Sequence, residues 1–162
     1  MTKTIFPATG DCEIVSSRSI DAPIGLVWAA WTDPAQLARW WGPAGFRNSF
    51  HAFDLRVGGT WRFTMHGPEG KGHYENECVF THIDAPRLLA WDRVSKPHFR
   101  VVATFSEEPG GRTRVQFRQV FDSAEACGKL RPHVTGKNEE NLDRLEAELE
   151  PGRRFTDSKT ND

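Results

Sequence analysis

The chain has 162 residues and a formal net charge of −1, which fits one domain with a substantial core and excludes a global attraction to nucleic acid. No apolar run is long enough for a membrane span, so we expect no membrane insertion. Three separated cysteines without CxxC spacing, and an N-terminus without a signal-peptide pattern, predict a cytoplasmic protein with reduced thiols.

The first elements in chain order are a strand and two short helices. Residues 13–21 have the mixed polarity of a half-buried strand. Pro23 suits the first turn of one helix, and Asp33 followed by Pro34 caps a second, which ends at Gly42 and Pro43. Their apolar positions are Ile24, Val27, Trp28, Trp31, Leu37, Trp40 and Trp41. Helices this short need a surface to pack against, and a sheet supplies one.

The middle of the chain predicts an antiparallel meander, because short strand patterns alternate with turn signals. The expected strands are 46–57, 60–66, 72–83, 87–94, 98–107 and 112–121. A short helical piece at 123–130 then meets Pro132, and a longer helix is expected from 133 or 137 to 149. We predict a single α+β domain over residues 12–150, with flexible ends at 1–11 and 151–162.

Several short motifs in this order resemble the START-like superfamily, the polyketide cyclase and lipid transport group (SRPBCC), and within it the family of the activator of Hsp90 ATPase. The motifs are Ala22–Pro23, Val27–Trp28, Trp31–Pro34, Trp40–Pro43, Asp54–Gly59, Ile83–Leu88 and Leu142–Leu145. The resemblance implies a helix-grip fold, in which a curved antiparallel sheet wraps around a long C-terminal helix. It also implies a cavity between sheet and helix that in many relatives holds a lipid, sterol or polyketide.

The resemblance has two limits. The co-chaperone that names the family carries a further N-terminal domain. We expect no such domain in a chain of this length, so we do not expect the co-chaperone role to transfer directly. Relatives often have a tryptophan at the position of Asn138. An asparagine there either leaves a roomier, more polar cavity or, if the helix starts later, lies in solvent.

Strand alternation selects the residues expected to face the interior. The predicted lining residues are Trp61, Phe63, Met65, Phe105 and Phe117, with Asn138 from the helix and Trp40 and Trp41 closing one end. These side chains could equally form an ordinary core. Gln119 shares the inner face and either binds a ligand or meets water at the rim. The opposite, convex face is expected to carry Arg62, Arg100, Arg114 and Arg118. We expect these arginines to be solvated, and the alternative is a site for an anionic partner.

Catalytic and metal-binding motifs are weak. No nucleophile motif is present, and no cofactor is expected. His66, His73 and Glu75 could meet across a hairpin, but without a recognised ligand spacing we predict no metal. Asp54 and Arg56 favour an intrastrand ion pair near the turn at 58–59, and the alternative is a ligand-anchoring or acid/base role.

Three functional hypotheses follow. The first is binding of a small apolar molecule in the cavity. The second is a cyclase- or dehydratase-like enzyme in the same cavity, which requires Asp54, His73 or Glu75 to face inward. The third is interaction with a chaperone through an outer surface. Open strand edges also favour a homodimer.

Overall fold

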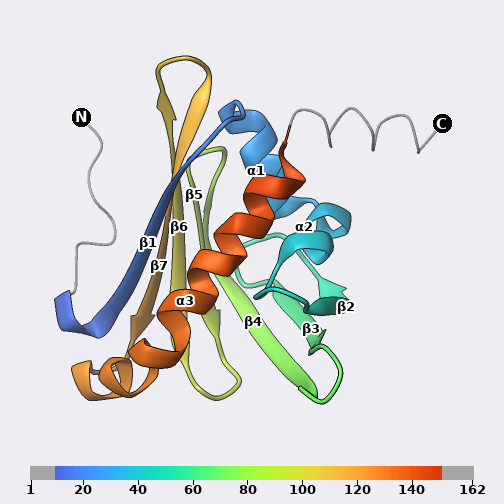
Figure 1. Ribbon diagram of the computed structural model, residues 1–162, viewed down its shortest axis with the longest axis vertical. Coiled ribbons are helices and arrows are strands. Elements are labelled where there is room, and N and C mark those ends of the chain that lie inside the picture. Colours follow the sequence, from blue (N-terminus) through green and yellow to red (C-terminus); the bar gives the residue numbers. More distant parts are fainter. Residues whose placement is uncertain (1–9, 151–162) are drawn as a thin grey trace.

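A computed structural model describes residues 10–150 and places a seven-stranded sheet beside three α-helices (Figure 1). The elements are η1 (Gly10–Cys12), β1 (Glu13–Ile20), α1 (Ile24–Thr32), α2 (Pro34–Trp40), β2 (Arg47–Phe53), β3 (Thr60–His66), β4 (His73–Asp84), β5 (Leu88–Arg93), β6 (Phe99–Glu108), β7 (Arg112–Phe121) and α3 (Ala124–Glu148). The predicted α+β helix-grip fold is confirmed. The predicted flexible ends lie outside the described residues, except 10 and 11, which belong to η1.

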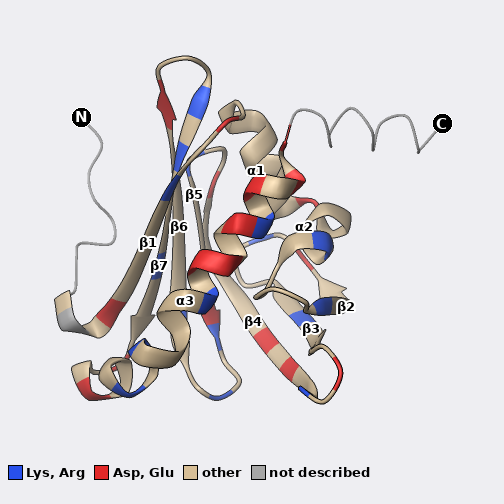
Figure 2. Ribbon diagram, viewed as in Figure 1, with Lys and Arg blue, Asp and Glu red and all other residues tan. Residues whose placement is uncertain are grey.

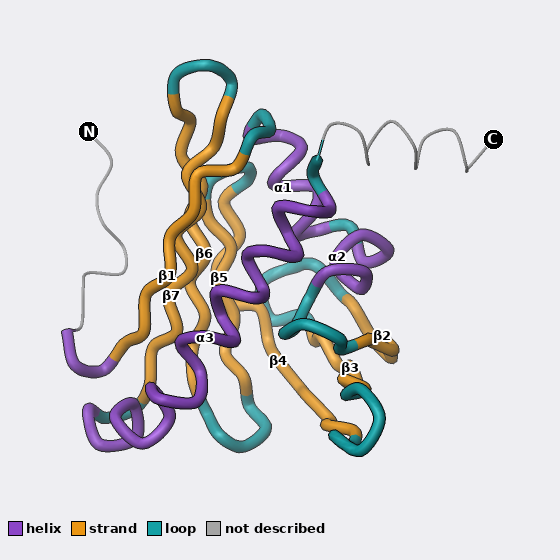
Figure 3. The backbone as a smooth tube through the Cα atoms, viewed as in Figure 1, coloured by secondary structure: helices purple, strands orange, loops and turns teal. Residues whose placement is uncertain are grey.

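The sheet is antiparallel throughout, with strand order β1-β7-β6-β5-β4-β3-β2. Strands β2 to β7 follow one another as the predicted meander, and β1 adds to β7 (Figure 3). Register shifts interrupt the pairing at Phe50/Ala52 and at Phe80/His82. Such irregularities bend strands and increase their twist, which helps the sheet to curve around the helices.

The second short helix begins where the sequence predicts, whereas α1 begins at Ile24, with Pro23 as the residue before it rather than in its first turn. The Asp33 carboxylate accepts a hydrogen bond from the Ala35 N–H at 3.1 Å, with Pro34 in the first turn of α2. The side chain of Gln36 donates to the same carboxylate at 3.3 Å. One side chain therefore satisfies an otherwise unpaired backbone donor and fixes the start of α2.

The turn at 58–59 is held against β4 as well as joining β2 to β3. The Gly58 N–H donates to the Phe80 carbonyl at 2.8 Å, and the Phe80 N–H donates to the Gly59 carbonyl at 3.0 Å. A Cβ atom at Gly59 would collide with the backbone carbonyl oxygen of Asp54. Glycine is therefore required at position 59 by close backbone approach.

Helix α3 differs from prediction because it is one helix rather than two pieces. It runs through Pro132 without interruption, and its first turns change direction relative to the rest (Figures 1 and 3). Proline bends a helix rather than ending it when surrounding contacts hold both halves. The Ser123 hydroxyl caps the start by accepting from the Ala126 N–H at 3.0 Å. No helix in residues 10–150 is long and apolar enough to cross a membrane.

The core lies between the inner face of the sheet and the helices, and tryptophans dominate it. Trp31 packs edge-on against Trp40 with ring centroids 4.9 Å apart, and Trp61 against Trp91 at 5.2 Å. The indole N–H groups of Trp31 and Trp61 are buried without an acceptor among the described residues. The aromatic packing therefore outweighs two unsatisfied donors.

The convex face corrects one expectation. Arg62 and Arg114 are exposed and Arg100 is half-buried, but only 6% of Arg118 is exposed. Arg118 donates to the Glu13 carboxylate at 2.8 Å, and both side chains are buried. The opposite charge on the neighbouring strand permits this burial, because it offsets part of the cost of removing the guanidinium from water.

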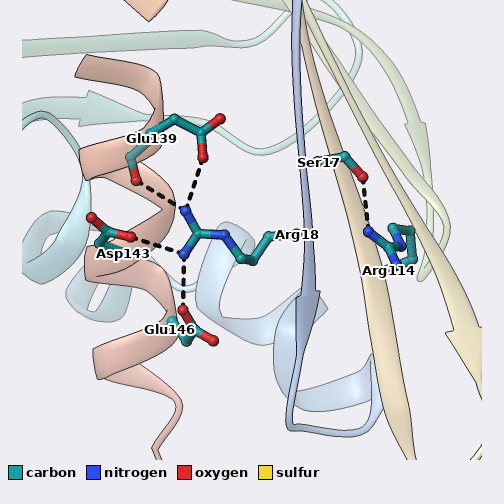
Figure 4. Close-up of polar contacts among 6 residues, drawn as sticks. All are labelled: Ser17, Arg18, Arg114, Glu139, Asp143 and Glu146. Atoms are coloured by element: carbon teal, nitrogen blue, oxygen red, sulfur yellow. Dashed lines mark hydrogen bonds and ion pairs between the residues drawn. The ribbon is translucent and has the colours of Figure 1, made fainter. Parts of the chain in front are cut away.

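A charged clasp joins β1 to α3. The Arg18 guanidinium bonds Glu139, Asp143 and Glu146 at 3.0, 2.9 and 2.8 Å, while Ser17 on the same strand points to Arg114 (Figure 4). Acidic bands along α3 supply these partners (Figure 2). Burial opposes the charge on Arg18, but the three hydrogen bonds outweigh it and raise the Arg18 pKa.

Candidate functional site

A partly enclosed cavity of about 170 Å³ lies between the inner face of the sheet and α3. Its apolar walls include Phe63 and Met65 from β3, Trp91 from β5 and Phe117 from β7. Trp41, which follows α2, forms a further wall. Strands β3 to β7, helix α3 and the residues that follow α2 therefore meet at one space that is mostly apolar.

The wall at Trp41 is fixed by two side chains of α3. The Asn141 side-chain oxygen accepts from the Gly42 N–H at 3.1 Å. One Arg144 nitrogen, Nη1, donates to the carbonyls of Trp41, Gly42 and Pro43 at 3.2, 3.0 and 2.9 Å. Burial lowers the Arg144 pKa, yet a guanidinium keeps its charge at neutral pH. Arg144 therefore works as a fixed hydrogen-bond donor that ties this wall to α3.

Asn138 and Gln119 form the polar bridge across the cavity. The Asn138 Nδ2 donates to the Gln119 Oε1 at 2.9 Å, and each residue is only 7% exposed. Both line the cavity. Asn138 lies well inside α3, so the alternative of a later helix start with a solvated Asn138 is wrong. Gln119 meets a protein partner rather than rim water.

Arg93 brings a positive charge to the same cavity. Its Nε donates to Asn76 Oδ1 at 2.9 Å, and its Nη1 donates to the carbonyls of Ser95 and Pro97 at 3.0 and 2.9 Å. The guanidinium carbon lies 5.6 Å from the centre of the Phe99 ring. Burial lowers the Arg93 pKa, and no carboxylate within residues 10–150 pairs with this side chain.

Cys78 is the thiol in the cavity wall. Burial raises its pKa to about 12, so it stays protonated at neutral pH. Because the thiolate is the reactive form, Cys78 is a poor nucleophile. The residue contributes a small, weakly polar wall.

The eight predicted site residues divide into two groups. Those that line the cavity are Trp41, Phe63, Met65, Phe117 and Asn138. The other three, Trp40, Trp61 and Phe105, are buried in the surrounding core. Trp40 donates its indole N–H to the Ala30 carbonyl at 2.9 Å, and Phe105 packs against Trp31 at 5.5 Å.

The candidate acids and bases lie elsewhere. Asp54, His73 and Glu75 are exposed and do not line the cavity. Asp54 pairs with Arg56 at 2.7 Å. His66 and His73 approach each other with 2.8 Å between their Nδ1 atoms. Within residues 10–150 no group of three or more ligating side chains has metal-binding geometry.

Sequence reasoning missed several lining residues, and strand alternation could have identified those on β4 and β5. Asn76 and Cys78 alternate with exposed residues on β4, and Trp91 and Arg93 share the inner face of β5. The prediction selected faces from apolar residues on β3, β6 and β7, so the polar and charged lining residues Asn76 and Arg93 were not considered.

The comparisons with known proteins agree with this architecture. A family model described as Activator of Hsp90 ATPase homolog 1-like protein matches residues 21–150. A solution structure of an Arthrobacter aurescens protein is 27% identical, with a TM-score of 0.78, and 90% of each chain is covered. A crystal structure from Mycobacterium smegmatis is 25% identical, with a TM-score of 0.76, and covers 87% of this chain and 92% of that one.

A third solved structure carries the family description itself. The AHSA1-like protein from Aeromonas hydrophila is 26% identical, with a TM-score of 0.65, and covers 83% of this chain and 93% of that one. No curated protein shows a significant match. On the strength of the family model, which spans most of its length, the chain belongs to the activator of Hsp90 ATPase homolog 1-like family, with a START-like fold.

Proposed function

We propose that the protein binds a small, largely apolar molecule in the cavity between the sheet and α3. The observation that carries the proposal is the composition of the cavity: aromatic walls, a few polar groups and partial enclosure. This is the usual make-up of a small-molecule site, where apolar burial supplies affinity and a few polar groups set orientation.

The size of the cavity limits the ligand. A dry protein cavity of about 150 Å³ holds benzene. A cavity of about 170 Å³ therefore suits a single-ring or short-chain compound. Among the lipid, sterol and polyketide classes that the resemblance implies, a fused-ring sterol requires more space than this. We therefore propose a ligand that is small compared with the lipids, sterols and polyketides that the resemblance implies.

Binding is better supported than catalysis in the same cavity. A cyclase- or dehydratase-like reaction needs an acid or base beside the substrate. The three residues considered for that role, Asp54, His73 and Glu75, lie outside the cavity. Cys78 lies inside it, but its thiol stays protonated at neutral pH. The chaperone hypothesis rests on the family description.

The direct test is an NMR titration of the isotopically labelled protein with 3-phenylpropanol, a neutral single-ring probe. Saturable shifts should concentrate at Phe63, Trp91 and Phe117. Asn138→Trp should abolish them while leaving the fold intact, because the indole occupies the cavity. Glu125→Trp, which adds the same ring at an exposed position on α3, should bind like the wild type. Shifts spread over the surface, or unchanged binding by Asn138→Trp, would overturn the proposal.

A further inference from the structure

The charged groups of the cavity are all of one sign. Arg93 and Lys137 line it, and within residues 10–150 no aspartate or glutamate does. The remaining polar lining is uncharged: Asn76, Cys78, Gln119, Asn138 and Asn141. The cavity therefore presents positive charge without a protein counter-charge.

Arg93 is the more informative of the two cations. Its side chain is half-buried and donates three hydrogen bonds to neutral acceptors, which are the Asn76 side chain and two backbone carbonyls. These bonds use Nε and Nη1, whereas Nη2 has no acceptor within the described part of the chain. A partly desolvated cation without an anion is costly, and a ligand that supplies the anion recovers that cost.

The neighbours of Arg93 hold the guanidinium in place for such a ligand. Asn76 and the carbonyls of Ser95 and Pro97 fix its plane, and the Phe99 ring lies beside it. A guanidinium fixed in this way loses little freedom on binding, and its Nη2 group keeps N–H donors for a carboxylate oxygen. Lys137, exposed on α3, adds a mobile second charge at the same cavity.

We propose that the ligand is a small single-ring or short-chain carboxylic acid, with its carboxylate bound by Arg93 and assisted by Lys137, and its apolar part between Phe63, Trp91 and Phe117. This inference rests on the proposed function and narrows its ligand class. The acid enters in its ionised form, and its apolar end reaches the aromatic walls.

A matched pair of probes separates charge from shape. Isothermal titration calorimetry with 3-phenylpropanoate and 3-phenylpropanol compares ligands that differ only in the acid group. Wild-type protein should bind the acid at least about tenfold more tightly, the effect of a charge-assisted hydrogen bond in a partly buried site. Higher salt should weaken binding of the acid and leave binding of the alcohol unchanged.

The variants assign that preference to residues. Arg93→Met should remove most of it, and Lys137→Met should reduce affinity for the acid several-fold without changing that for the alcohol. Lys129→Met, the same substitution at an exposed position on α3, should change neither. Because Arg93 also holds the 95–97 loop, Arg93→Lys is the second variant. It keeps the charge, loses the fixed Nη2 donor and should give intermediate affinity.

The outcomes distinguish the two proposals. Preference for the acid that falls in the Arg93 and Lys137 variants supports the inference. Equal affinity for acid and alcohol overturns the inference but leaves the proposed function standing. Failure of both probes to bind overturns both.

Discussion

The bridge between Asn138 and Gln119 allows a quantitative test of how α3 is tied to the sheet. Asn138→Leu removes the donor to Gln119 Oε1, and Gln119→Leu removes the acceptor from Asn138. Each single change leaves one polar group at a 7% exposed position without its partner. An unsatisfied buried group costs about 1–3 kcal/mol, so we expect each variant to lose stability in that range.

The double variant should cost less than the sum of the two single changes. It removes both unsatisfied groups and places two apolar side chains against the aromatic walls, which is close to neutral. We therefore expect a favourable coupling of about 1 kcal/mol or more between the two positions. For a chain of this size 1 kcal/mol corresponds to about 2–4 °C in Tm.

The assay is guanidinium unfolding followed by tryptophan fluorescence for the wild type, the two single variants and the double variant. The four proteins should share one m-value, so that differences in the unfolding midpoint report differences in stability. The control cycle is Glu125 and Lys129, an exposed ion pair on α3 with 3.4 Å between its charged atoms. The coupling energy of this exposed pair should be about 0.3–0.5 kcal/mol. Costs at 138 and 119 that add to within about 0.3–0.5 kcal/mol would refute the bridge.

Three further predictions concern other parts of the fold. Burial raises the Cys78 pKa from 9.0 to about 12, so the contribution of this thiol to stability is complete below pH 9 and is lost as pH rises toward 12. Unfolding at pH 10 should show a loss of about 1 kcal/mol that is absent in Cys78→Ala. Arg118→Met leaves the buried Glu13 carboxylate unpaired and should lower the free energy of unfolding, measured by urea titration, by about 3–5 kcal/mol. Lys129→Met removes an exposed ion pair and should lower it by about 0.5 kcal/mol or less. Gly59→Ala should lower Tm more than Gly58→Ala, where φ is +85° but a Cβ meets no atom within 4 Å; equal shifts would contradict the steric account.

Short sequence patterns predicted the helices and strands well, because helix starts and turns depend on residues that are neighbours in the sequence. Asp33 with Pro34 marks a helix start by supplying an acceptor and a preset φ, and the structure has α2 beginning there. The meander followed from turn signals between short alternating runs. Pro132 led to the wrong prediction of two separate helical pieces. The rule that proline ends a helix does not include the distant contacts that can hold a bent helix together.

The site was harder to predict because its key pairings are distant in sequence. Gln119 and Asn138 meet only once α3 crosses the sheet, and Arg118 is buried only because Glu13 lies on the neighbouring strand. Strand alternation predicts which face of the sheet a residue lies on, but it does not identify the partner that offsets the cost of burying a charge. Arg93 is different, since the alternation of β5 already places it beside Trp91 on the inner face.

Native mass spectrometry of the protein purified from its own organism tests the central claim most directly. The wild type should carry one additional small mass that dissociates on unfolding and fragments as a carboxylic acid. Asn138→Trp, expressed in the same cells, should carry none, because the indole fills the cavity. A wild-type spectrum with the protein mass alone, or the same adduct on both proteins, would contradict a ligand site between the sheet and α3.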